Sequence, residues 1–297
     1  MKNLWGLVRW ILLHPLNRRG HFGRVKALAR FARWQIASRL LPAKMVLPFV
    51  DSTHLCLERA MTGASGNWYC GLHEPAEMGL VLHGLRPEGL FVDVGANVGS
   101  YTILSAGAVG DNVISIEPIP QTFARLRANV NLNDLQRKVE LLNIGISDQN
   151  GFLNFTVSLD TMNRVALPDE QLNSISVPVR TLDDVMQGRS ADMIKIDVEG
   201  HELAVLRGAT NTLRDSRLKA VVMETNNSGR KYGVNGEELI QEMETHGFLA
   251  YTYDPLKRDF QRASSMSLGN SIFLRDPILV RQICRTAKTF SLLNGPI

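Results

Sequence analysis

The chain has 297 residues, of which 44% are apolar and 21% are charged, close to the average of soluble globular proteins. This composition excludes low-complexity and fibrous proteins and supplies enough apolar side chains for a sizeable core. The formal net charge of +4 is unevenly spread along the chain, so it does not by itself indicate a nucleic-acid partner.

The first 50 residues contain ten Lys or Arg residues and no Asp or Glu, whereas the rest of the chain is mildly acidic. Apolar residues recur at spacings of three and four between Phe22 and Leu40, which predicts an amphipathic helix. Two interpretations of this basic arm stay open. It could attach to an anionic membrane surface or a membrane-bound partner, or it could pack on the body of the protein with a solvated basic face.

The apolar run at 4–13 is too short to span a bilayer, and no cleavage site follows it. We therefore expect neither a transmembrane helix nor a secretory signal. The three cysteines, Cys56, Cys70 and Cys284, are far apart and odd in number, which argues against a disulfide framework and a zinc site. A reducing compartment fits them best, so we expect a cytoplasmic protein that could associate with a membrane through residues 1–50.

From residue 90 onward, apolar runs alternate with amphipathic segments. Strands are predicted at 90–95, 112–117, 139–144, 193–197 and 219–224, and helices at 100–108, 121–131, 202–214 and 236–246. Two further strands, 248–253 and 271–274, are predicted to close the sheet as an antiparallel pair. This alternation predicts an α/β fold with a mainly parallel, doubly wound sheet.

One segment interrupts the alternation. Residues 152–157 and 174–179 alternate between two faces and are predicted to form an extra hairpin. Its long connection, 158–173, is where we expect substrate contacts, because long loops in compact domains are often functional. The tip of this connection consists of Met162, Asn163 and Arg164. The predicted organisation is a helical arm at 1–50, a helical lid or connector at 51–89, an α/β domain at 90–280 and a tail at 281–297.

The first predicted strand of the α/β domain runs into the sequence DVGANVGS at 93–100. Its two glycines allow the backbone to approach a ligand closely where the next helix begins. Glu117 ends the second strand, where a carboxylate can accept hydrogen bonds from two ribose hydroxyls. A dinucleotide fingerprint requires glycine where Asn97 stands, and Asp93 would repel a pyrophosphate. S-adenosylmethionine has no phosphate and carries a sulfonium and an ammonium, so it fits this turn better.

These segments resemble the FkbM-type methyltransferase family. The resemblance rests on VDVGANVGSYT at 92–102, ISIEP at 114–118 and IKIDVEGHE at 194–202, and it extends over roughly 70–275. It implies a Rossmann-like class I methyltransferase fold with seven mostly parallel strands and an antiparallel closing strand. It also implies S-adenosylmethionine as methyl donor and, commonly, O-methylation of sugar or polyketide hydroxyls. The predicted cofactor-binding residues are Asp93, Gly95, Ala96, Asn97, Gly99, Ser100, Tyr101, Glu117, Pro118 and Asn143.

Methyl transfer to a hydroxyl requires removal of the hydroxyl proton. Asp197, Glu199 and His201 follow the fourth strand and are the candidate catalytic residues; Glu224 ends the fifth strand. Asp197 could act as base or orient the acceptor, and Glu199 could instead cap the next helix. His201 is an attractive base because an ordinary imidazole pKa lies near ~6.5, but a structural role is open for it. The same groups could ligate a metal, although we expect none.

The predicted function is therefore that of an S-adenosylmethionine-dependent methyltransferase that modifies a hydroxyl of a sugar, a glycan or a related secondary metabolite. The alternatives are a nicotinamide-dependent oxidoreductase and a non-catalytic cofactor-binding scaffold. We expect a small-molecule or glycan acceptor. An acidic body without a stacking-aromatic motif argues against nucleic acid, and the sequence does not indicate an oligomeric state.

Overall fold

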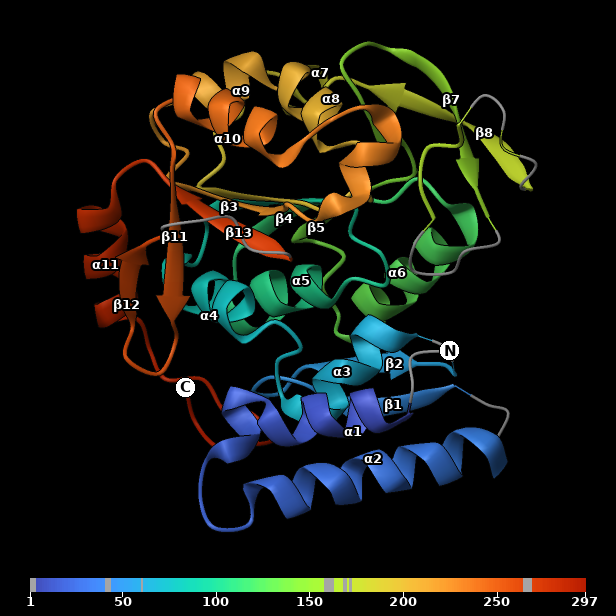
Figure 1. The fold of residues 1–297 in the computed structure, drawn as a ribbon, viewed down its shortest axis with the longest axis vertical. Helices are drawn as coiled ribbons and strands as arrows, with labels where there is room; N and C mark the ends of the chain where they lie inside the picture. Colours follow the sequence, from blue (N-terminus) through green and yellow to red (C-terminus); the bar gives the residue numbers. More distant parts are fainter. Residues whose placement is uncertain are drawn as a thin grey trace.

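The structure is a computed structural model that describes residues 4–40, 44–59, 61–157, 163–167, 170, 173–263 and 269–297. A large sheet lies in the middle, helices cover both of its faces, and an N-terminal layer lies below the helices of one face (Figure 1). The chain therefore has the α/β architecture that its alternating pattern predicts.

The large sheet has eight strands in the order β12-β11-β13-β10-β9-β3-β4-β5. They are β3 (Leu90–Val94), β4 (Asn112–Ile116), β5 (Val139–Leu142), β9 (Met193–Ile196), β10 (Ala220–Glu224), β11 (Leu249–Asp254), β12 (Asp259–Arg262) and β13 (Asn270–Leu274). The five strands from β10 to β5 are parallel, and β13 inserts antiparallel between β10 and β11. The predicted number of seven is one too few, because β12 pairs with β11 as an added edge strand.

Strand residues alternate between the two faces of the sheet. Phe91 and Met193 belong to the core on one face, and Val92 and Ile194 to the core on the other. The first face is covered by α4 (Pro75–Gly84), α5 (Ser100–Ile103), the π-helical η2 (Leu104–Val109), α6 (Pro120–Leu132) and α11 (Pro277–Thr286). The second is covered by α7 (Leu182–Met186), α8 (Glu202–Arg207), α9 (Thr210–Arg214) and α10 (Gly236–Thr245), and the 3₁₀ helix η4 (Asn227–Tyr232) follows β10.

The single helix predicted at 202–214 is two helices, α8 and α9. The break lies at Gly208, where an added Cβ would lie 2.1 Å from the backbone oxygen of Ser147. The backbone after β6 thus lies so close to this position that a helix with side chains of ordinary size does not fit there. The prediction of one helix was wrong because this contact comes from a distant part of the chain.

The insert forms a small separate sheet of β6 (Gly145–Ile146), β7 (Gly151–Thr156) and β8 (Ser174–Arg180), in which β7 and β8 are antiparallel. The predicted hairpin is confirmed. In its connection, Met162 lies outside the described residues. Arg164 pairs with Glu170 at 2.7 Å (Nη1 to Oε2), and the Tyr232 hydroxyl donates to the backbone oxygen of Val165. The described part of the connection therefore packs against η4, beside the end of β10.

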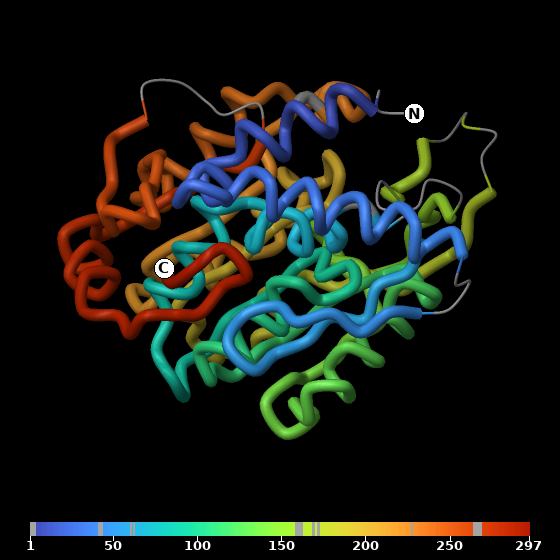
Figure 2. The backbone as a smooth tube through the Cα atoms, turned by 90° about the horizontal axis from the view of Figure 1, so that it is seen from below, coloured from blue at the N-terminus to red at the C-terminus, as the bar shows by residue number. Residues whose placement is uncertain are grey.

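The N-terminal layer consists of α1 (Leu4–Leu13), η1 (Pro15–Arg18), α2 (Gly23–Leu40), β1 (Met45–Pro48), β2 (His54–Leu57) and α3 (Thr62–Cys70). Seen from below, α1 and α2 lie next to each other across one face of the molecule (Figure 2). Among the described helices, none combines the length and the apolar character that a bilayer span requires.

Candidate active site

Two turns at the carboxyl ends of neighbouring strands touch each other. The turn after β3 contains Gly95, whose φ is +79°, and a Cβ added there would lie 1.8 Å from the backbone oxygen of Asp197 after β9. Only glycine permits both this φ and this close approach. The predicted cofactor turn is therefore held against a predicted catalytic acid, at the point of the sheet where α/β proteins bind ligands.

We expect Gly95→Ala to lower the thermal stability more than Gly233→Ala does. Gly233 has nearly the same φ, +77°, but a Cβ added there has nothing within 4 Å. Both variants therefore meet the backbone strain, of about 1–3 kcal/mol, whereas only the first also meets the clash with Asp197. Scanning calorimetry of the two variants measures the difference. Equal melting temperatures would contradict the contact between the two turns.

Asp93, at the end of β3, is only 1% exposed. Its Oδ2 accepts a hydrogen bond of 2.7 Å from Thr102 Oγ1, which in turn lies 2.7 Å from Ser115 Oγ. Its Oδ1 is buried and has no hydrogen-bond partner among the described residues. Burial raises the pKa of Asp93, and the nearby Lys195 ammonium opposes the rise. A buried carboxylate oxygen without a donor fits a ligand that carries positive charge.

Glu117 follows β4 and is 5% exposed. Its Oε2 accepts a hydrogen bond from the backbone N–H of Asn97 (3.0 Å), and its Oε1 accepts one from Ile119 (2.9 Å). Burial raises the pKa of Glu117 to about 7. The amide of Asn143 donates to the backbone oxygens of Glu117 and Pro118, at 2.8 and 3.0 Å, and holds this segment in place. Each carboxylate oxygen keeps a lone pair that a ribose hydroxyl can use.

The remaining residues of the predicted cofactor turn bond to the protein itself. The backbone N–H groups of Gly95 and Ala96 both donate to the oxygen of Ile116, and that of Gly99 donates to Ala96, all at 2.9 Å. Gly99 has a φ of +91°, and a Cβ there would lie 2.6 Å from the side chain of Leu126 on α6. These contacts give the turn its shape, and contact of the turn with a cofactor stays a prediction.

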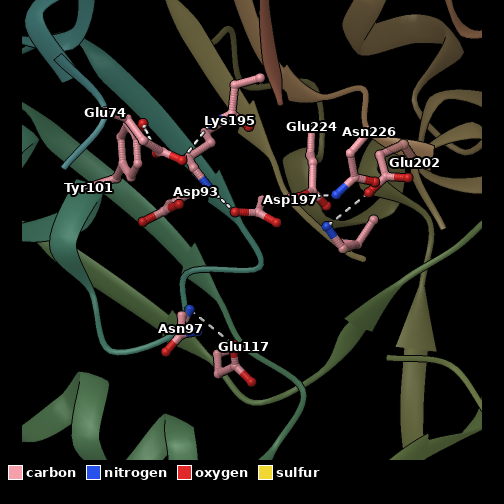
Figure 3. Close-up of polar contacts among 12 residues, drawn as sticks. Glu74, Asp93, Asn97, Tyr101, Glu117, Lys195, Asp197, Glu202, Glu224 and Asn226 are labelled. Atoms are coloured by element: carbon pink, nitrogen blue, oxygen red, sulfur yellow. Dashed lines mark hydrogen bonds and ion pairs between the residues drawn. The ribbon is translucent and has the colours of Figure 1, made fainter. Parts of the chain in front are cut away.

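Ser100 and Tyr101, at the start of α5, connect the turn to the segment before α4. Ser100 Oγ accepts a hydrogen bond of 3.2 Å from Asn67, and the Tyr101 hydroxyl donates to Glu74 at 2.6 Å. The other oxygen of Glu74 accepts a hydrogen bond of 2.6 Å from Asn270 on β13. Glu74 thus joins the predicted lid segment to α5 and to the closing strand (Figure 3).

Lys195 is a residue of the candidate site that was not predicted from the sequence. It lies within β9 beside Asp93, its side chain is 4% exposed, and its Nζ is 2.8 Å from Asp197 Oδ2. Burial lowers the pKa of Lys195, but the charges of Asp197, Asp93 and Glu74 outweigh that effect and raise it. The available signal was a lysine inside an otherwise apolar strand, since a buried lysine requires carboxylate partners.

Three carboxylates gather at the ends of β9 and β10. Asp197, Glu199 and Glu224 each offer an oxygen that lies within 4.8 Å of the others, and Figure 3 shows Asp197 and Glu224 side by side. Burial, followed by the charges of Asp197 and Glu199, raises the pKa of Glu224 to about 9. Burial and the charge of Asp197 raise the pKa of Glu199 to about 7. Such a group can share protons at neutral pH or hold a hard cation such as Mg²⁺.

We expect Glu224→Gln to stabilise the protein by a margin that grows as the pH rises. The pKa of Glu224 is about 9 in the folded protein and about 4.5 as the ordinary value. Between these values the folded state binds more protons than the unfolded chain, so the contribution of Glu224 to stability falls as the pH rises. Thermal unfolding across this window measures the margin, with Glu244→Gln on the exposed side of α10 as the control. If the difference in stability between the variant and the unaltered chain does not change with pH, Glu224 does not hold a proton in the folded protein.

Glu199 has a φ of +55°, which is uncommon for a residue other than glycine and which persists where the surroundings impose it. Capping of the next helix by Glu199 is not what the structure shows. Instead, Glu202 Oε1 accepts the backbone N–H groups of Val198 (3.3 Å) and Gly200 (3.0 Å). The carboxylate of Glu199 is therefore left to the group that contains Asp197.

His201 does not belong to this carboxylate group within the described part of the chain. Its Nε2 lies 3.0 Å from Ser147 Oγ, and its ring packs edge-on against Tyr232 with 6.1 Å between the centroids. Burial lowers the pKa of His201. The structure thus brings Glu224, and not His201, together with Asp197 and Glu199.

The strand order, the glycine turn after β3 and the acids at the strand ends define a Rossmann-like class I methyltransferase fold. Residues 93–250 match the model of the methyltransferase FkbM domain. Because this match covers more than half of the chain, the chain belongs to the FkbM methyltransferase family. Membership confirms the predicted family and S-adenosylmethionine as the methyl donor, and it argues against a nicotinamide oxidoreductase.

Two curated relatives share this region. The hexuronic acid methyltransferase AglP of Haloferax volcanii is 30% identical over 138 residues, which cover 46% of this chain and 56% of AglP. The 2-O-methyltransferase NoeI of Sinorhizobium fredii is 30% identical over 156 residues, which cover 44% of this chain and 62% of NoeI. The chain thus spans less than two thirds of the length of either relative.

Proposed function

We propose that this chain transfers the methyl group of S-adenosylmethionine to a hydroxyl of a sugar, in a free glycoside or in a glycan. The observation that supports the proposal is the contact between the glycine turn after β3, the proposed donor turn, and Asp197, one of three carboxylates that lie together. Carboxylates are good hydrogen-bond acceptors for sugar hydroxyls. The names of the two relatives, a hexuronic acid methyltransferase and a 2-O-methyltransferase, support the same acceptor class.

In the proposed donor site, Glu117 accepts hydrogen bonds from the ribose hydroxyls, and the unpaired Oδ1 of Asp93 receives the positive end of the donor. The observations that support this fit are the two anchored oxygens of Glu117 and the orphaned oxygen of Asp93. The bound donor supplies an electrophilic methyl group on a sulfonium. The turn residues Gly95 to Tyr101 shape this site.

In the proposed acceptor site, Glu199 takes the proton from the hydroxyl as its oxygen forms the bond to the methyl carbon and the bond from carbon to sulfur breaks. Glu199 suits this role because its pKa of about 7 lies near the pH at which a general base is most effective. Asp197, held by Lys195, and Glu224 orient the hydroxyl. Positioning of the reactants then supplies much of the acceleration.

A panel of matched acceptors tests this function. The protein is incubated with methyl-labelled S-adenosylmethionine and with hexosides and hexuronides, each beside a deoxy analogue that lacks one hydroxyl. We expect the label on one hydroxyl oxygen, and no label when that hydroxyl is absent. Labelling of nitrogen or sulfur acceptors alone would contradict a sugar hydroxyl. Activity that is lost on chelation and restored by Mg²⁺ would assign the three carboxylates to a metal ion instead of a proton.

We also propose that the protein works in the cytoplasm and makes a peripheral contact with a membrane through residues 1–50. The three cysteines are free, which fits a reducing compartment. The ten basic residues of this segment, without any acidic residue, support an anionic partner.

A further inference from the structure

Helix α2 has two apolar faces, and only one of them is covered. Ala27, Phe31 and Trp34 are buried against the rest of the N-terminal layer. The buried guanidinium of Arg30 fastens this face, since its Nη2 donates to Tyr69 O at 2.7 Å and to Asn294 Oδ1 at 2.9 Å. The orientation of the helix is therefore set by contacts with α3 and with the C-terminal tail.

The opposite face of α2 presents an apolar stripe to solvent. Val25, Ala29, Ala32, Ile36 and Leu40 are exposed and follow one another at spacings of three and four. Val25 is 61%, Ile36 60% and Leu40 73% exposed. Side chains at these spacings lie on one face of a helix. The apolar periodicity of the sequence thus marks the uncovered face, and the residues between these positions provide the covered one.

Basic side chains border this stripe on both sides. On one side, Lys26 and Arg33 each follow a residue of the stripe by one position. On the other side, Arg24 and Arg39 each precede a residue of the stripe by one position. All four are exposed, and within the described residues none of them forms an ion pair with an acid. An apolar stripe between two basic rows is the pattern of a helix that lies in the headgroup region of an anionic membrane.

The same face is on the outside of the molecule. Helix α2 is the outermost element below the sheet in Figure 1, and in Figure 2 it runs next to α1 across the face seen from below. Leu4 and Leu13 of α1 are also exposed, at 62% and 54%. An outward helix can lie flat on a bilayer without any rearrangement of the fold. A second copy of the chain would instead bring the same basic rows against each other.

We propose that the α2 stripe, formed by Val25, Ala29, Ala32, Ile36 and Leu40, lies on the surface of an anionic bilayer, with Arg24, Lys26, Arg33 and Arg39 on the lipid headgroups. This inference deepens the proposed peripheral contact of residues 1–50 and rests on it. It does not depend on the proposed chemistry, because the stripe and the site belong to different layers of the fold. The consequence is that the site is held near a membrane surface, where acceptors attached to lipids would be found.

Co-sedimentation with vesicles tests the stripe. The full chain is mixed with vesicles of phosphatidylcholine alone and with vesicles that also contain phosphatidylserine. We expect binding only to the second kind, and weaker binding as salt rises. Val25→Asn with Ile36→Asn should weaken binding about tenfold or more, and Lys26→Gln with Arg33→Gln about tenfold. These side chains are exposed, so the fold should persist, which the melting temperature checks.

Two matched variants separate the stripe from general surface properties. Ile278→Asn removes an apolar side chain that is 67% exposed on α11, and Arg127→Gln with Arg137→Gln removes the same charge from another exposed region. Both should bind vesicles like the unaltered chain, and so should the donor-site variant Glu117→Ala. Equal binding to both kinds of vesicle, or stripe variants that bind unchanged, would overturn the proposal. So would a dimer in sedimentation that the stripe variants abolish, because the stripe would then be covered by a second copy.

Discussion

Glu199→Gln should lower kcat for methyl transfer by about 10²–10⁴-fold, the usual contribution of a general base. The affinity for S-adenosylmethionine should stay nearly unchanged, because the carboxylate of Glu199 lies with Asp197 and Glu224 and not with Glu117. The pH profile carries the sharper information. The rate of the unaltered enzyme should rise through about pH 7 as Glu199 loses its proton, and this rise should be absent from the variant.

The matched control for this prediction is His201→Gln. His201 bonds to Ser147 and lies apart from the carboxylates, so its variant should keep both kcat within about threefold and the rise of the rate near pH 7. If His201→Gln loses the rise and Glu199→Gln keeps it, the imidazole is the base. Because the charge of Glu199 raises the pKa of Glu224, a pKa measured in the rate profile belongs to the group of carboxylates and not to one residue alone.

Glu117→Ala should weaken the binding of S-adenosylmethionine by about 100-fold. The variant loses two hydrogen bonds from ribose hydroxyls to a charged acceptor, each of about 1.5–3 kcal/mol, and the solvent that enters offsets part of the loss. Equilibrium dialysis with labelled donor measures the dissociation constant.

Glu117→Gln is the informative companion variant. Its side chain oxygen can accept the backbone N–H of only one of Asn97 and Ile119. Its NH₂ group then faces the other N–H, so the side chain keeps its size while one anchor of the turn and one acceptor for the ribose are lost. We expect an intermediate affinity. Unchanged donor affinity in both variants would show that the ribose lies elsewhere. If the alanine variant alone fails to fold, the test rests on the glutamine variant, which must then bind the donor more weakly than the unaltered chain.

The alternation of apolar runs predicted the parallel strands and most helices, because buried strands and amphipathic helices have distinct periods. β12 escaped prediction because Asp259–Arg262 is mostly polar, and it becomes a strand only through pairing with β11. The break at Gly208 likewise depends on Ser147. Both predictions failed because the deciding contacts join segments that are polar or far apart in the sequence. A local pattern of apolar residues does not contain such contacts.

The residues of the candidate site likewise include some that a local pattern indicates and some that it does not. Asp93 and Glu117 could be proposed for the donor site from the sequence because each lies at the carboxyl end of a strand, and such ends of a parallel sheet meet at one edge. His201 is close to Asp197 in sequence, but the chain reverses at Gly200, whose φ is +107°, and the imidazole points to Ser147. Lys195 was overlooked because its acidic partners include Asp93 and Glu74, which lie on two other segments, besides the neighbouring Asp197.

In the proposed site, this chain holds S-adenosylmethionine beside a group of carboxylates. Isothermal titration calorimetry of the intact protein with S-adenosylmethionine, and separately with NADH, measures this binding. We expect one saturable site for S-adenosylmethionine, for which S-adenosylhomocysteine competes, and no binding of NADH. A folded protein that binds NADH and not S-adenosylmethionine would overturn the proposed function.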